Sequence, residues 1–110
     1  MTGAQRIAAE RARQIKKLGW TAEHDEGHVG GALAMAAACY AAAAASTRIY
    51  EKSDYAAGIH FDDPFPWQED ARPYDGNVLR DATSAEAIRL LEKAGALIAA
   101  EIDRLIGGGR

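Results

Sequence analysis

The chain has little of what stabilises secreted proteins or anchors membrane proteins. It contains one cysteine, Cys39, so no disulfide can form within its 110 residues. The run from Ala32 to Ala45 is shorter and less apolar than the roughly 20 residues that cross a bilayer. No apolar stretch follows the first basic residues, so we expect no signal peptide. These features predict a cytoplasmic protein that does not bind membranes.

Aromatic residues and prolines are also scarce. Aromatics make up 7% of the chain, and the three prolines all lie between residues 64 and 73. The hydrophobic share, 48%, is that of a globular protein, and much of it is alanine. A chain of this length forms one domain, here residues 1–110. We expect its helices to pack closely through small side chains.

Positive charge is not in excess. The net charge is −3 and the pI is about 5.5, which argues against general binding to nucleic acid backbones. A local basic group in the N-terminal segment could still attract a phosphate or an acidic partner, or simply form a solvated helix face. Its members are Arg6, Arg11, Arg13, Lys16 and Lys17.

Two helices are expected in the first half of the chain. Residues 2–18 carry apolar anchors at helical spacing, with Thr2 as N-cap and Gly19 as stop. Residues 31–50 are rich in alanine, the strongest helix former. Because nearly every face of this second helix is small or apolar, we expect it to be central and enclosed.

A long irregular connector and a third helix are expected in the second half. Residues 53–82 hold the prolines and several turn-forming pairs, with apolar side chains that pack part of the connector onto the helices. Residues 84–106 begin at a capping box of Thr83 and Glu86 and carry a seam of the kind found in coiled coils. The seam residues are Ile88, Leu91, Gly95, Ile98, Ile102 and Leu105. The sequence therefore predicts an all-α fold, a small bundle of three long helices.

The polar stretch after the first helix is the strongest candidate site. It holds three carboxylates and two imidazoles in six residues, a set suited to acid–base work or a divalent metal. We expect it to fold against the polar face of the first helix and form a pocket for a ligand. The expected ligand-binding residues are Glu10, Arg13, Gln14, Trp20, Glu23, His24, Asp25, His28 and Trp67. Arg13 would meet a phosphate or carboxylate, and Trp20 or Trp67 would stack on a flat ligand.

Each of these residues also has a purely structural interpretation. The charges of the polar stretch could be solvated or tie a loop to a helix end, and Trp20 could simply close the core. The spacing of His24 and His28 resembles a zinc-protease motif, but Asp25 replaces the catalytic glutamate and Gly27 weakens the helix. Cys39 lies in an apolar helix, which excludes it as a nucleophile.

A resemblance is carried by Glu10-Arg11-Ala12-Arg13-Gln14-Ile15 and by Gly19-Trp20-Thr21-Ala22-Glu23-His24-Asp25 with His28. The pattern resembles a family of small phage and prophage proteins, and residues 93–105 are similar to that family's last helix. The resemblance implies a phage-encoded protein of the host-cell cytoplasm. It does not indicate an activity. The chain departs from the family at Ala32, where a glutamate is usual, and at Ala71-Arg72-Pro73.

Three functions follow from these observations. The first is a binding protein that needs no cofactor and holds a nucleotide-like ligand or a host defence protein. The second is a phosphohydrolase that uses Mg²⁺ or Mn²⁺ on Glu10, Glu23, Asp25 and Asp63, with His24 or His28 as base. The third is a homo-oligomer joined through the seam and the alanine-rich helix. The spacing of the acids favours binding over hydrolysis, and no catalytic residue can be assigned.

Overall fold

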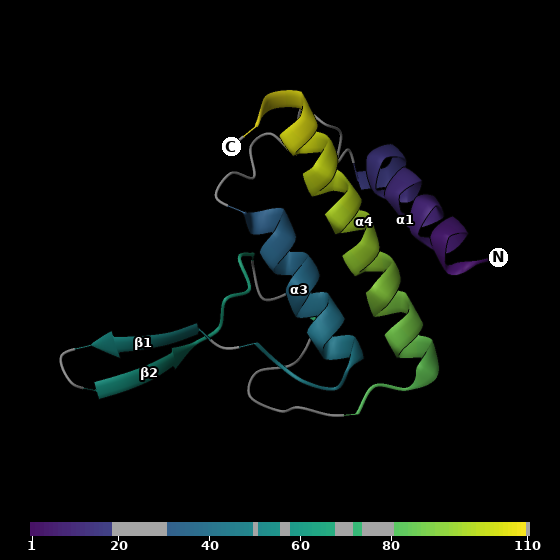
Figure 1. Ribbon diagram of the computed structural model, residues 1–110. Helices are drawn as coiled ribbons and strands as arrows, with labels where there is room; N and C mark the ends of the chain where they lie inside the picture. The colour runs from purple at the N-terminus through teal and green to yellow at the C-terminus, as the bar shows by residue number, and fades with distance from the viewer. Residues whose placement is uncertain (19–30, 50, 56–57, 68–71, 74–80, 110) are drawn as a thin grey trace.

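Helices dominate the computed structural model, as Figure 1 shows. Three are described: α1 (Gly3–Leu18), α3 (Ala32–Ala44) and α4 (Ser84–Gly108). The structure describes residues 1–18, 31–49, 51–55, 58–67, 72–73 and 81–109. The all-α class predicted from the sequence is confirmed.

The ends of the helices follow local chemistry. At the start of α1 the Thr2 hydroxyl accepts from the Gln5 amide (3.2 Å), and the Gln5 side chain accepts from the Thr2 amide (2.8 Å). Thr83 and Glu86 form the same reciprocal pair at the start of α4. Both predicted caps are confirmed, and α4 extends two residues beyond the predicted end at 106.

Helix α3 ends at Ala44, although the sequence predicted a helix to residue 50. Ser46 adopts a left-handed conformation (φ 57°), and the amides of Ser46 and Thr47 donate back to the carbonyls of Ala43 and Ala42. Such a turn satisfies the last carbonyls of a helix and stops it. The Ser46 hydroxyl also accepts from the Ala82 amide (3.0 Å), which ties this turn to the segment before α4.

The sequence predicted an irregular connector, but part of the connector is regular. It contains two antiparallel strands, β1 (Glu51–Tyr55) and β2 (Gly58–Asp62), with Ser53 opposite His60 at the centre. Apolar Ile59 and Phe61 alternate with polar neighbours along β2, the period of a strand. The strand pair projects from the helices in Figure 1.

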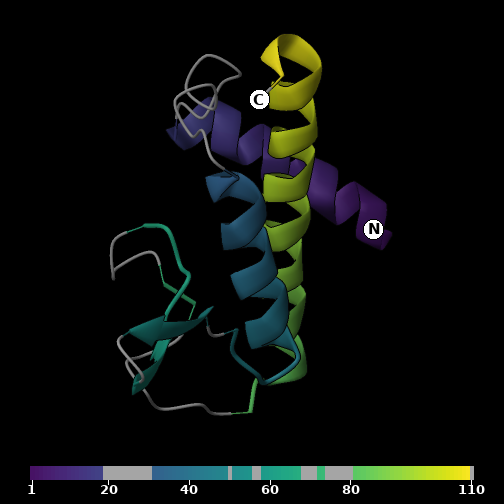
Figure 2. The same ribbon diagram turned by 60° about the vertical axis from the view of Figure 1, so that its left-hand side comes forward.

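The core lies mainly between α3 and α4, which run side by side in opposite directions in both ribbon views (Figures 1 and 2). Leu33 and Leu97 are its largest fully buried apolar side chains, and alanines fill most of the remaining contact. Phe65 returns from the connector to cover this core, with Trp67 at its edge. The predicted packing through small side chains is confirmed.

The central helix is α4, so the expectation that α3 would be enclosed is wrong. Helix α1 packs on another side of α4 and crosses it steeply (Figure 2). Gly95 makes the crossing close, because a Cβ built there would lie 2.6 Å from Ile7 Cδ1. Among the described helices, none packs on the remaining side of the α3–α4 pair. No described helix is long and apolar enough to cross a membrane.

Candidate anion-binding site on α1 and α4

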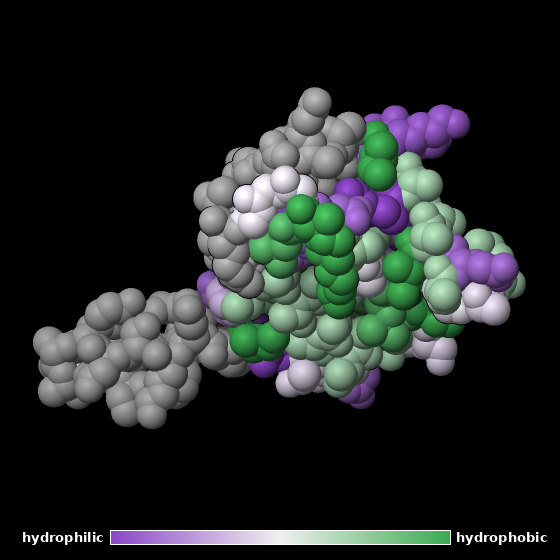
Figure 3. All heavy atoms as spheres, turned by 45° about the horizontal axis from the view of Figure 1, so that its top comes forward, coloured by the Kyte–Doolittle hydropathy of each residue, from purple (hydrophilic) through white to green (hydrophobic). Residues whose placement is uncertain are grey.

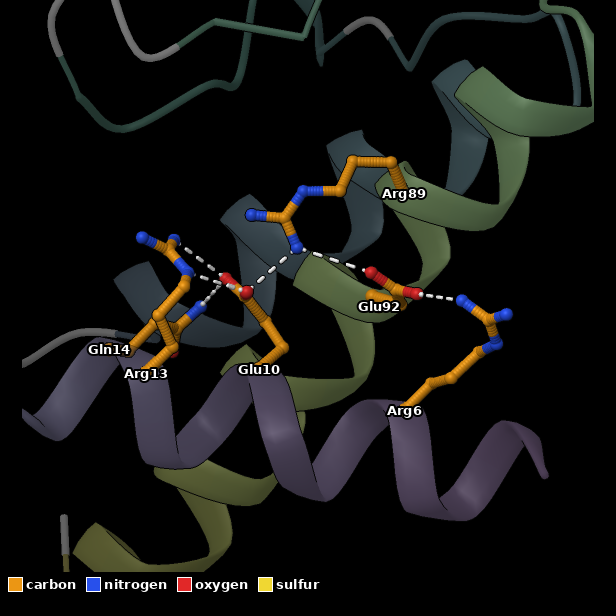
Figure 4. Close-up of polar contacts among 6 residues, drawn as sticks. All are labelled: Arg6, Glu10, Arg13, Gln14, Arg89 and Glu92. Atoms are coloured by element: carbon orange, nitrogen blue, oxygen red, sulfur yellow. Dashed lines mark hydrogen bonds and ion pairs between the residues drawn. The ribbon is translucent and has the colours of Figure 1, made fainter. Parts of the chain in front are cut away.

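The densest polar contacts in the described chain surround Glu10 of α1 (Figure 4). Its side chain is only 3% exposed. Arg13 donates to both carboxylate oxygens, from Nε at 2.8 Å and from Nη2 at 2.9 Å. Gln14 Nε2 donates at 3.1 Å, and Arg89 Nη1 of α4 donates at 2.7 Å. The carboxylate is thus held by its own helix and by the helix that crosses it.

A second carboxylate extends this cluster along α4. Glu92 accepts from Arg89 Nη1 on one oxygen and from Arg6 Nη1 of α1 on the other, both at 3.2 Å. Figure 4 shows the resulting chain of alternating charges from Arg6 to Arg13. A shallow hollow of about 190 Å³ opens beside it. The hollow is lined by Met1, Arg6, Ala9, Glu10, Arg13 and Glu92.

The protonation of Glu10 is set by these contacts. Burial alone would raise the pKa of Glu10, but the hydrogen bonds from Arg13 and Arg89 outweigh burial and lower it to about 2. The carboxylate is therefore charged at neutral pH. The same contacts raise the pKa values of the two arginines, chiefly through their hydrogen bonds to Glu10.

Lys93 links this cluster to the aromatic side of the core. Its Nζ lies 5.8 Å from the centre of the Tyr40 ring, a cation–π distance. Burial lowers the pKa of Lys93, and repulsion from Arg89 and Arg13 lowers it further. Tyr40 in turn meets Phe65 edge to face, with ring centres 5.9 Å apart.

Among the described residues, positive charge prevails in this region. Four cationic side chains, Arg6, Arg13, Arg89 and Lys93, stand against the two carboxylates. Arg13 and Arg89 are 39% and 42% exposed. Within the described residues, Nη1 of Arg13 and the Nε and Nη2 atoms of Arg89 make no hydrogen bond. The arrangement can therefore offer spare N–H groups to an anion.

Three of the nine predicted ligand-binding residues, Glu10, Arg13 and Gln14, come together here. The side-chain oxygen of Gln14 is buried and accepts no hydrogen bond from the described chain. Trp67 lies elsewhere, edge to face with Phe65 at 5.9 Å, where it covers core. The remaining five predicted residues, Trp20, Glu23, His24, Asp25 and His28, lie outside the described residues.

Sequence reasoning missed the contribution of α4. Arg89, Glu92 and Lys93 occupy one flank of that helix, three and four residues apart, which is the spacing of neighbours on a helix surface. The sequence signal that could have indicated this contribution was the row of charged residues beside the apolar seam of α4. Nothing in the sequence indicated that α1 would cross at this level.

The predicted metal ligands that the structure describes are paired with arginines. Glu10 is held as above, and Asp63 lies 3.3 Å from Arg72 Nε and 3.7 Å from Arg48 Nη2. A cation at either carboxylate would have to displace guanidinium groups. In the described part of the chain, no three side chains of His, Cys, Asp or Glu gather as metal ligands.

Comparison with protein-family models, with curated proteins and with solved structures found no match for this chain.

Proposed function

We propose that the protein is a small binding protein whose α1–α4 crossing holds an anionic, nucleotide-like ligand by its phosphate. The observation that carries the proposal is the pair of half-exposed guanidinium groups, Arg13 and Arg89, that share the buried Glu10 carboxylate. Guanidinium groups bind phosphate oxygens through paired hydrogen bonds, a geometry that lysine does not offer. The proposal involves binding without turnover and without a metal.

The buried carboxylate supports this role because it fixes both guanidinium groups in place before a ligand arrives. An arginine that is already ordered loses less conformational entropy on binding than a free surface arginine. The carboxylate also lowers the local positive charge, but Arg6 and Lys93 keep the balance positive.

Titration calorimetry in the presence of EDTA would test the proposal, with inorganic phosphate, pyrophosphate and a panel of nucleotides as probes. We expect at least one phosphate compound to bind, with an affinity that falls as salt rises. Arg13→Gln and Arg89→Gln should each weaken binding about tenfold, the loss of one charge-assisted hydrogen bond. Arg13→Lys, which keeps the charge but not the fork, should weaken binding nearly as much.

The matched control is Lys16→Gln, which removes one positive charge from an exposed position on α1. It should leave affinity within about twofold, because long-range attraction is screened by salt. Circular dichroism would check that each variant remains folded. Failure of every phosphate compound to bind the folded protein would contradict the proposal, and so would an equal loss in Lys16→Gln. Product formed only with Mg²⁺ or Mn²⁺ would instead support the phosphohydrolase hypothesis.

A further inference from the structure

The predicted seam of α4 does not face the core. Ala94, Leu97 and Ala100 of α4 belong to the core shared with α3, and Glu101 lies beside the α3 alanines. The large seam residues stand on the open side instead and are about half exposed: Ile88 46%, Leu91 49%, Ile98 50% and Ile102 51%. The seam therefore leaves a row of branched apolar side chains in contact with solvent.

A groove runs beside this row, between α4 and α3. It has a volume of about 230 Å³ and an almost wholly apolar lining. Alanines form its α3 wall, and the seam isoleucines form its α4 wall. The lining residues are Ala34, Ala37, Ala38, Ala41, Ile98, Glu101 and Ile102. In Figure 3, strongly apolar side chains reach the surface of the helical part beside weakly apolar ones.

We infer that this face, Leu91, Ile98 and Ile102 with the alanine groove, binds a second copy of the chain about a two-fold axis. A two-fold interface uses the same surface of both copies, so that surface must be complementary to itself. This face is complementary to itself, since a ridge of branched side chains lies next to a groove of small ones. Ridges of one helix packing into grooves of another are the usual mode of helix association.

The heptad spacing supports the same occupant. Leu91 and Ile98 are seven residues apart, and Ile102 follows four residues later, the pattern of a helix that pairs along its length. The middle seam position, Gly95, is already taken by Ile7 of α1. The free part of the seam is therefore the part that adjoins the groove.

The exposed surface of the chain indicates how much area a stable dimer would have to cover. The chain exposes 7028 Å², and a stable interface covers about a tenth of a small protein, roughly 700 Å² here. Monomeric proteins seldom leave contiguous apolar patches of more than a few hundred Å² uncovered. We expect a dimer of about this size to dissociate in the micromolar range.

Charge argues against a lipid surface as the occupant. The Glu101 carboxylate lines the groove, and its Oε2 atom accepts no hydrogen bond from the described residues. A carboxylate at this place, in a chain of net charge −3, repels anionic lipid headgroups. Binding of a second copy does not bring the groove close to anionic headgroups, so this repulsion does not oppose it.

Sedimentation velocity from 5 to 500 μM would test the inference. We expect the native chain to shift from monomer to dimer over this range, and Ile98→Glu to stay monomeric. Ala38→Leu places a larger side chain in the groove and should weaken the dimer at least tenfold, because the partner's side chains can no longer enter it. Ile15→Glu is the matched control, because Ile15 is 41% exposed on α1, away from the face. It should dimerise as the native chain does.

Mixed cysteine variants would test the geometry independently. A disulfide should form between an Ile98→Cys copy and an Ala38→Cys copy faster than between two Ile15→Cys copies, while the buried Cys39 contributes little. A native chain that stays monomeric at 500 μM would overturn the inference. Equal disruption by Ile15→Glu, or binding of the monomer to neutral lipid vesicles through this face, would overturn it as well.

Discussion

At the scale of single residues, Glu10 is the most consequential side chain described. It is a buried carboxylate near the middle of a helix, and such a group is destabilising unless hydrogen bonds replace its lost water. Arg13, Gln14 and Arg89 provide those bonds at 2.7–3.1 Å. One residue thereby fixes the contact between two helices and the orientation of two arginines.

The pKa of Glu10 predicts how stability depends on pH. Because folding lowers that pKa from 4.5 to about 2, the carboxylate stabilises the fold above about pH 4.5, and this stabilisation is lost as pH falls toward 2. The lost stability should be about 1–3 kcal/mol, reduced from the full linkage value because both arginines are partly exposed. Urea unfolding at pH 7, 4 and 3 would measure it.

Glu10→Gln is the variant that isolates this effect. It should be less stable than the native protein at pH 7 by a few kcal/mol, because two arginines lose a charged acceptor. Its own loss of stability between pH 5 and 3 should be smaller than that of the native protein. An equal loss in both proteins would assign the pH dependence to other carboxylates.

At the scale of elements, the contact between α1 and α4 depends on a missing side chain. Glycine inside a helix is unfavourable by about 1 kcal/mol relative to alanine. Gly95 is nevertheless what the crossing requires, since three side-chain atoms of Ile7 lie within 3.0 Å of where a Cβ would stand. Gly95 therefore lowers the helix propensity of α4 but allows α1 to approach α4 closely.

Gly95→Ala should therefore destabilise the protein by about 1–2 kcal/mol despite the better helix former, because overpacking costs more than propensity gains. Ile7→Ala in the same chain should recover part of the loss by making room. A thermal unfolding cycle over the two single variants and the double variant measures the coupling. Gly107→Ala, with open space around its Cβ position, is the control and should not destabilise. A Gly95→Ala protein more stable than the native one would show that α1 can shift freely.

At the scale of the whole molecule, the two helix contacts differ in kind. Helices α3 and α4 share an apolar core of alanine, leucine and Tyr40. Helix α1 is held to α4 by the Gly95 contact and by ion pairs from Arg6, Arg89 and Arg11, the last to Asp103 at 3.8 Å. Ion pairs that are partly exposed contribute little each and weaken with salt.

We therefore expect α1 to open more readily than the α3–α4 pair. In native-state hydrogen exchange, the central amides of α3 and α4 should be protected about as strongly as global unfolding allows, and those of α1 less strongly. Changing the solution from pH 6 to pH 3.5 should lower protection in α1 first, because Glu10 takes up a proton once α1 opens and its pKa rises from about 2 toward 4.5, which favours the open state. Uniform protection across all three helices would show instead that the molecule opens as one unit.

The sequence alone determined the three helices of this protein, but not the two strands or the end of α3. Composition and periodicity predicted the helices, and Thr2, Thr83 and Gly31 marked their starts, because caps and propensities act between residues close in the chain. The small-residue packing followed from the alanine content. The grouping of Glu10, Arg13 and Gln14 was also predictable, since residues three and four apart share one helix face.

Only the tertiary structure decided which faces meet. The seam of α4 could equally well have faced the core by periodicity alone, but the structure buries Leu97 and its neighbouring alanines there and leaves the large seam residues about half exposed. The steep crossing of α1 brought Arg89 to Glu10 across 79 positions of sequence. Local periodicity indicates that a face exists, but packing among all the helices selects the partner of each face.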